Sequence, residues 1–261
     1  MKGLREIMKT RNVAAMPAAL TALACLVSGP TGVHAQTRDG WQFEATPYLW
    51  AAGMKGDMGI GKLEANGIEQ SFTDIAKSIR VGFMGAIEGH KDRFGFIADA
   101  IAMTLHQKEP APHGFLGDVD AKTTQQMYAL AATWRVSDGA TPIDLVGGVR
   151  SNYIKLDLDL SASALAPQGR FLVRSRTWVD GFVGARFRHP LSPQWSVSGY
   201  ADIGGGGSDS TWQFLAGVNY AISPDKTVRV GDSLMKVDYH RDDFLYDVST
   251  GGPYVGVGMR F

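Results

Sequence analysis

The stretch Val255-Gly-Val-Gly-Met-Arg-Phe261 alternates large apolar side chains with glycine and one arginine. Successive side chains of a β-strand point to opposite faces, so the four apolar side chains of this stretch would share one face of a strand. On a helix the same residues would be scattered around the axis. The stretch therefore predicts a β-strand with one apolar face and one small or polar face.

The same two-residue period recurs along nearly all of residues 41–261. Between residues 81 and 87, 179 and 187, and 212 and 220, apolar residues alternate with charged residues, polar residues or glycine. This pattern favours strands over helices. It predicts ten strands, at about residues 41–50, 80–90, 93–106, 121–136, 143–158, 171–188, 194–204, 211–222, 226–240 and 253–261.

The connections between these segments alternate in length. Short connections rich in Pro, Gly, Ser and Asp lie at 90–92, 137–142, 190–193 and 223–225, and longer polar ones lie at 51–79, 107–120, 159–170, 205–210 and 241–252. Tight turns on one side and long loops on the other are typical of transmembrane barrels. We therefore predict an all-β fold, a transmembrane up-and-down antiparallel β-barrel of about ten strands with short periplasmic turns and long outer loops. Eight and twelve strands are the alternatives.

The first long connection, 51–79, has features of its own. The segments Ile60 to Lys62 and Ile68 to Phe72 suggest a hairpin inside this loop. Ser71-Phe72-Thr73-Asp74 has the spacing of a capping box, which predicts the start of one short helix through Ile79.

The N-terminal segment predicts export from the cytoplasm. Basic residues between Lys2 and Arg11 precede an apolar run from Val13 to Val27, and the small-residue site Val33-His34-Ala35 follows. This is the layout of a secretory signal peptide, and we predict that residues 1–35 are cleaved and that 36–261 form the barrel. A lipid-anchored Cys25 is the alternative, but Ala22 stands where a lipoprotein signal has an aliphatic residue.

Composition excludes several kinds of function. Without residues 1–35 the chain is mildly acidic, because that segment holds four basic residues and one acidic residue. This argues against a nucleic-acid partner. The single cysteine, Cys25, lies inside the predicted signal, so we expect no disulfide and no cysteine metal site in the exported protein. We predict no cofactor.

The end of the chain also suggests a location. A soluble β-sandwich would alternate in the same way, but a last strand that ends in the aromatic residue Phe261 resembles the signal read by the outer-membrane barrel-insertion machinery. Segments 41–50, 82–88, 94–99, 178–186 and 199–204 resemble a family of small, uncharacterised outer-membrane barrel proteins of Gram-negative bacteria. The resemblance implies the bacterial outer membrane, with its lipid and lipopolysaccharide, as surroundings, and the insertion machinery as a partner through Phe261.

Charged residues lie mainly on the face opposite the apolar one, which we take as the lumen face. That face includes Glu44, Arg80, Glu88, Asp99, Arg135, Asp144, Arg150, Arg174, Arg176, Asp180, Arg186, Arg188, Asp202, Asp232, Lys236, Asp238 and Arg260. Acids and bases are nearly equal in number, and charges in a narrow lumen must be paired or hydrated. We predict a lumen plugged by ion pairs, with Arg174, Arg176, Asp180, Arg186, Arg188, Asp144 and Asp202 as the candidate network.

A catalytic site is a weaker interpretation. Asp238-Tyr239-His240 together with Asp157-Leu158-Asp159 resembles the acidic and Asp/His pairs of omptin surface proteases. The strand period puts Asp238 and His240 inward and Asp157 and Asp159 outward, so the two pairs would not converge. We predict no catalytic or metal residues and expect a non-enzymatic barrel, structural or surface-binding. A restricted porin for small solutes is the alternative, and an omptin-like or lipid-modifying barrel enzyme is the third.

Overall fold

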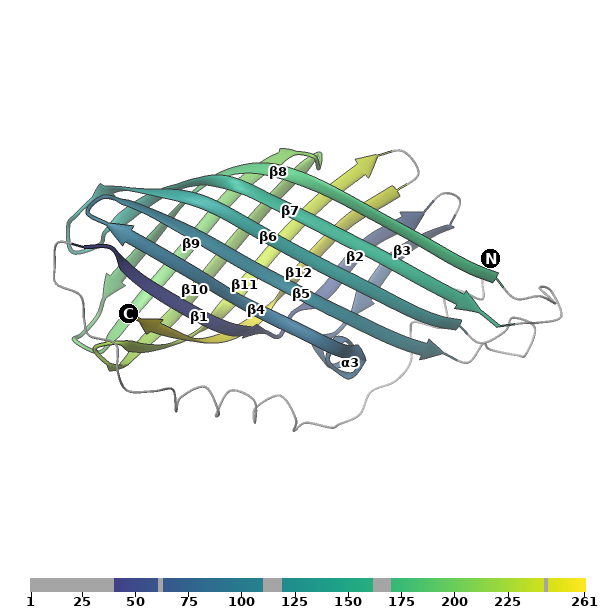
Figure 1. Ribbon diagram of the computed structural model, residues 1–261, viewed down its shortest axis with the longest axis horizontal. Coiled ribbons are helices and arrows are strands. Elements are labelled where there is room, and N and C mark those ends of the chain that lie inside the picture. The colour runs from purple at the N-terminus through teal and green to yellow at the C-terminus, as the bar shows by residue number, and fades with distance from the viewer. Residues whose placement is uncertain (1–39, 61–62, 110–118, 162–169, 242–243) are drawn as a thin grey trace.

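The computed structural model describes residues 40–60, 63–109, 119–161, 170–241 and 244–261 (Figure 1). The predicted signal peptide, residues 1–35, lies outside these residues. The elements are β1 (Gln42–Trp50), β2 (Gly53–Ile60), β3 (Leu63–Gln70), α3 (Phe72–Ser78), β4 (Ile79–Lys91), β5 (Phe94–Glu109), β6 (Val119–Ser137), β7 (Ile143–Leu160), β8 (Arg170–Pro190), β9 (Trp195–Gly206), β10 (Ser210–Ser223), β11 (Lys226–Arg241) and β12 (Phe244–Arg260).

These strands form a closed antiparallel barrel. Each strand from β4 to β12 pairs with the next, β1 pairs with β4, and β12 returns to pair with β1. The two segments β1 and β2 follow one another along β12, which pairs with β1 through Tyr254–Arg260 and with β2 through Phe244–Gly251. β1 and β2 therefore together take one strand position in the barrel wall, and the wall has ten strand positions. The predicted fold class is confirmed.

The outside of the turn-side half is apolar. Its exposed large side chains include Phe83, Ile87, Leu130, Trp134, Leu145, Val149, Val183, Phe187, Trp195, Phe214, Val218, Tyr220 and Val230. Several of the aromatic ones lie near the turns, where they can meet the membrane interface. Among the described residues no helix is long and apolar enough to cross a membrane.

The strands continue well beyond this apolar band. The twenty-one residues of β8 reach about 50 Å along the axis at a tilt of about 40°, against an apolar band of about 25 Å. Past Val149 on β7 the outward positions become polar, with Lys155 bonded to Asp157 at 3.0 Å. We call the part beyond the band the outer half (right in Figure 1).

The outer half separates into two groups of strands. β8 pairs with β9 only from Asp180 to Pro190, so its first residues extend past β9. β4 pairs with β1 only through its turn-side residues, and β3 instead pairs with β2. The outer ends of β4 to β8 thus face those of β11, β12, β2 and β3 (Figure 1). An apolar core lies between the two groups.

Two outer segments differ from the sequence prediction. The last strand begins at Phe244, where we expected a loop through residue 252, because Phe244, Tyr246 and Val248 turn inward to this core. The 51–79 connection holds both the hairpin β2–β3 and the helix α3, and its hairpin starts earlier than the sequence suggested. Ser71 and Asp74 bond to each other's backbone N–H at 3.3 and 3.4 Å, which is the predicted capping box.

Candidate functional site: the barrel lumen

The turn-side half of the barrel encloses a cavity of about 510 Å³. Its lining extends from Gln42, His90 and Arg260 near the turns to Ile101 and Met127, which belong to the apolar core of the outer half. Small residues line part of it, among them Ala86, Ala129, Ala131 and Gly256. Gly217 and Gly231 leave the space into which the ring of Tyr254 projects, and an added Cβ at either glycine would collide with that ring.

Arginines and carboxylates are paired across the turn-side part of this cavity. Arg186 donates to Glu88 at 2.5 Å and to Asp144 at 3.0 Å. Asp144 also accepts from Arg135 at 2.8 Å. Glu44 is bonded by Arg229 and, at 3.1 Å, by Arg260. These pairs join β1, β4, β6, β7, β8, β11 and β12 through the lumen.

A second group lies deeper in the lumen. Arg150 on β7 and Asp202 on β9 form an ion pair at 2.6 Å, and their side chains are only 2% and 0% exposed. Tyr200 donates to Asp202 at 2.5 Å, and Arg150 also reaches Gln213 at 3.0 Å and lies 4.7 Å above the Phe182 ring. Tyr48 donates to Asp99 at 3.0 Å. Side chains thus satisfy most of the buried charge at this level.

Only part of the ion-pair network that the sequence predicts is present in the structure. It brings Arg186 and Asp144 together, as cross-strand neighbours on β8 and β7. Asp202 pairs instead with Arg150, and Asp180 accepts the Ser208 N–H and hydroxyl at 2.6 and 2.8 Å. Arg188 lines the cavity without an ion pair among the described residues.

Arg174 and Arg176 lie outside this network. Both are in the outer half of β8, beyond the end of β9, and each donates to the carbonyl of its preceding residue at 2.9 and 3.4 Å. Arg176 also lies 5.9 Å from the centre of the Phe244 ring. They share the inward phase with Arg186 but are separated from its acids along the strand.

The sequence interpretation was wrong about which side chains of β11 face the lumen. Ser233, Met235, Val237 and Tyr239 are buried inward, so Asp232, Lys236 and Asp238 face outward. Arg229, which the sequence interpretation omitted, is on the inward phase of the same strand and lines the cavity. Its alternation with Val228 and Val230 was the signal that could have found it.

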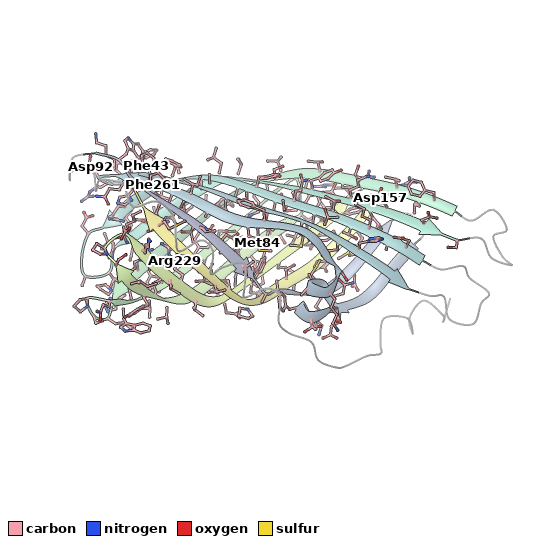
Figure 2. All side chains as sticks on the ribbon, turned by 60° about the horizontal axis from the view of Figure 1, so that its bottom comes forward. Phe43, Met84, Asp92, Asp157, Arg229 and Phe261 are labelled. Carbon is pink, nitrogen blue, oxygen red and sulfur yellow. The ribbon has the colours of Figure 1, made fainter. Side chains whose placement is uncertain are left out.

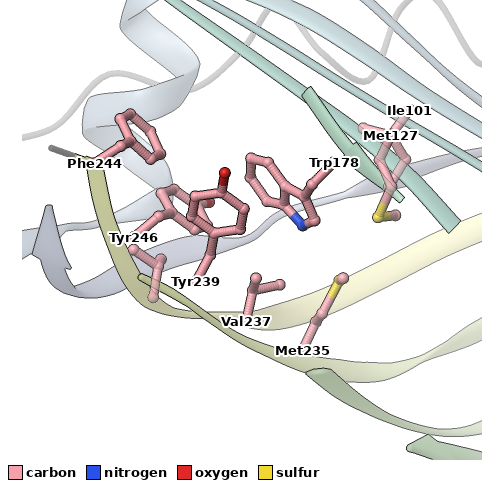
Figure 3. Close-up of a cluster of buried hydrophobic side chains, with 9 residues drawn as sticks. Ile101, Met127, Trp178, Met235, Val237, Tyr239, Phe244 and Tyr246 are labelled. Carbon is pink, nitrogen blue, oxygen red and sulfur yellow. The ribbon is translucent and has the colours of Figure 1, made fainter. Parts of the chain in front are cut away.

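Aromatic and methionine side chains pack against one another at the outer end of the cavity (Figure 3). Trp178 on β8 meets Tyr239 on β11 with 4.5 Å between ring centroids and Tyr246 on β12 at 5.8 Å. The full group, which we call the apolar cluster, is Ile101, Met127, Trp178, Met235, Val237, Tyr239, Phe244, Tyr246 and Val248, with Met54, Met58, Met84 and Met103 packed against it. Sequence analysis did not predict it, because these residues follow the same alternation as lipid-facing ones.

The residues that resemble a protease site stay apart. Asp157 and Asp159 face outward on β7, and Asp238 and His240 face outward on β11. These two strands are separated by β8, β9 and β10. The four side chains therefore do not meet. The sequence placed Asp238 and His240 inward, but both face outward.

The fold is shared with known proteins of Gram-negative outer membranes. The structure is similar to outer membrane protease OmpT from Escherichia coli, with a TM-score of 0.54 and 9% identity over 87% of this chain and 99% of that one. Weaker likenesses include the major outer membrane protein from Thermus thermophilus (TM-score 0.40, 13% identity, 85% of this chain, 100% of that one). Another is Ail from Yersinia pestis, solved with a heparin analogue (0.39, 13%, 85% and 99%).

These likenesses concern the fold, because the sequence identities are low. No family model matches the chain. No curated protein matches it either. The closed ten-stranded barrel, its outward apolar band and its fold similarity to OmpT define the class: the protein is a bacterial outer-membrane β-barrel.

Proposed function

We propose that this protein is a non-enzymatic outer-membrane barrel whose lumen is closed and which acts through its outer half, as a structural or surface-binding protein. The apolar cluster carries this proposal. Trp178, from one side of the lumen, contacts Tyr239 and Tyr246 from the other, and all three rings are 6% exposed or less. An apolar constriction of this kind opposes the entry of water and ions.

The ion pairs below the cluster support the same proposal in a different way. They hold the charges of the lumen in place, but they leave the cavity of about 510 Å³ between them. A closed lumen therefore depends on the cluster more than on the ion pairs. This changes the sequence-based hypothesis, in which ion pairs alone plug the barrel.

Surface binding is supported by the length of the strands. The outer parts of β5 to β8 and of β11 and β12 project beyond the apolar band and have a core of their own. This gives the protein a rigid platform outside the membrane, next to outer-membrane lipid and lipopolysaccharide. The non-enzymatic part of the proposal is supported by the separation of the Asp/His and Asp/Asp pairs on β11 and β7.

Single-channel recording in planar bilayers tests the proposal. We expect wild-type protein to conduct poorly, and Trp178→Ala combined with Tyr239→Ala to raise the conductance, because it removes the two closest rings of the cluster. Trp212→Ala combined with Tyr220→Ala is the matched control, since both rings lie on the outward face. Only variants that keep heat-modifiable migration are compared.

A further variant separates the two barriers. Arg186→Ala combined with Arg188→Ala removes lumen charges but leaves the apolar cluster, so we expect its conductance to stay near that of the wild type. If this variant opens the channel, the ion pairs form the barrier and the cluster does not. A wild-type channel as conductive as an open porin would contradict the closed lumen and favour restricted passage of small solutes.

A further inference from the structure

Among the residues that the structure describes, Arg188 is a cation inside the cavity that forms no ion pair. Its side chain comes from the inward face of β8 and lines the turn-side part of the cavity. Within the described part of the chain no carboxylate lies within 4.0 Å of it. The charges that act on it most are Arg229, Glu44, Glu88 and Arg260. Both glutamates are bonded to other arginines, Glu88 to Arg186 and Glu44 to Arg229 and Arg260, and neither is within ion-pair distance of Arg188.

Two more hydrogen-bond donors near Arg188 lack an acceptor. The Nε atom of Arg229 is buried and makes no hydrogen bond, although the other nitrogens of this guanidinium face Glu44 and Glu88. The Tyr254 hydroxyl lies in the same cavity, near Arg229 and Arg188, and makes no side-chain hydrogen bond to another described residue. Unlike the Arg229 Nε atom, it is not a fully buried donor. A buried donor without an acceptor costs about 1–3 kcal/mol. The Nε atom of Arg229 is such a donor.

The charged residues that line the cavity favour a ligand of negative charge. In the turn-side part, the described residues that line the cavity include five arginines and three carboxylates: Arg135, Arg186, Arg188, Arg229 and Arg260, and Glu44, Glu88 and Asp144. Deeper in the cavity Arg150 is matched by Asp202, and Asp99 adds one more acid. The positive charge is therefore in excess at the end that opens toward the turns, and a surface of one sign attracts ligands of the opposite sign.

We propose that the cavity binds a small oxyanion, a carboxylate or a phosphate, at Arg188, beside the guanidinium of Arg229 and the hydroxyl of Tyr254. A guanidinium presents paired N–H donors that match the oxygens of both groups. The volume of about 510 Å³ lies in the range of small-molecule sites. The ligand enters from the turn end, because the apolar cluster lies at the other end of the cavity. The site is independent of the proposed closed lumen, since a leaky barrel would keep these three residues.

Isothermal titration of the purified full-length barrel in detergent tests the site. The probes are inorganic phosphate, acetate and succinate, with chloride at the same ionic strength as the reference. We expect saturable binding of at least one oxyanion, and a comparison of the three separates a phosphate site from a carboxylate site. Arg188→Gln should weaken binding about tenfold or more, because it removes a charge-assisted hydrogen bond. Tyr254→Phe should weaken it less.

Arg93→Gln is the matched control, because Arg93 is an exposed turn arginine paired with Asp138 outside the cavity. It makes the same change of net charge and should bind as the wild type does. Arg188→Lys keeps the charge and should restore part of the affinity that Arg188→Gln loses. Absence of saturable oxyanion binding at millimolar concentrations would overturn the proposal. Equal affinity for chloride, or wild-type affinity in folded Arg188→Gln, would also overturn it.

Discussion

The ring of Phe261 stacks on the ring of Phe43, with 6.0 Å between centroids and 18° between planes. The backbones of the two residues also exchange hydrogen bonds, from Phe261 N–H to Phe43 O at 3.0 Å and from Phe43 N–H to Phe261 O at 3.4 Å. The last residue of the chain therefore fastens β12 to β1 at the turn end, where the barrel closes (Figure 2).

Deletion of Phe261 should impair assembly of the barrel more than export of the chain. The deletion removes the stacking partner and both backbone bonds at the seam, and it leaves the N-terminal segment unchanged. We expect the fraction of protein with heat-modifiable migration to fall sharply in outer-membrane fractions. Phe187→Ala is the control, because Phe187 is similarly exposed to lipid but lies inside β8. Wild-type assembly of the truncated chain would contradict the role of Phe261.

Arg150→Ala should destabilise the barrel strongly. Removal of one partner of a buried ion pair leaves the other charge uncompensated, which costs about 3–5 kcal/mol. The measurement is urea unfolding of the protein folded in lipid vesicles. The double variant Arg150→Ala with Asp202→Ala should lose less stability than Arg150→Ala alone, because no charge is then left unpaired. Arg93→Ala breaks an exposed pair and should cost less than about 1 kcal/mol. Equal losses for Arg150→Ala and Arg93→Ala would disprove the prediction.

Ser71→Ala should loosen α3 without unfolding the barrel. The Ser71 hydroxyl caps the helix at the Asp74 N–H, and such a cap contributes about 1 kcal/mol. We expect hydrogen exchange at the first amides of α3 to become about fivefold faster, which is the equivalent of that free energy. Thr73→Ala in the same turn serves as the control. Unchanged exchange in Ser71→Ala would show that packing of Ile75 alone holds the helix.

The pKa of Asp225 should depend on Ser223. The Ser223 hydroxyl donates to Asp225 at 2.6 Å in the β10–β11 turn, and this hydrogen bond lowers the pKa of Asp225. A carboxyl whose pKa is lower in the folded state stabilises the fold above its unfolded pKa and loses that contribution as the pH falls through its folded pKa. Ser223→Ala should raise the pKa of Asp225, as followed by carboxyl NMR, and Ser192→Ala should leave it unchanged. The same pKa in both variants would contradict this cause.

The sequence predicted the membrane half better than the outer half. Within the membrane, apolar residues face lipid and polar ones face the lumen, so the alternation and the short turns were enough to predict the strands of the barrel wall. In the outer half the surroundings are aqueous, and Tyr246 and Val248 turn inward to a core. Ser249 and Thr250 are polar, and two glycines follow them, so the sequence analysis assigned this stretch to a loop.

The lumen charges were predictable as a set but not as pairs. The strand period shows that Arg186 and Glu88 face inward, but they lie on β8 and β4, which are not neighbours in the sheet. Arg150 and Asp202 are similarly separated by β8. Contacts across a closed lumen depend on the tilt and stagger of the whole barrel, which no single strand encodes. Local sequence patterns placed Arg188 on the lumen face, but they could not show the cavity left between the pairs or that Arg188 has no ion pair among the described residues.

The outer part of β8 has a further consequence for a protein crowded among its own copies. From residue 170 to residue 178, no described strand pairs with the side of β8 that faces away from β7. An open edge of this length can recruit a strand from a neighbouring molecule. Arg174 and Arg176 stand on this edge, and two copies that approached edge to edge would bring like charges together. We therefore expect the two arginines to oppose edge-to-edge pairing of neighbouring barrels.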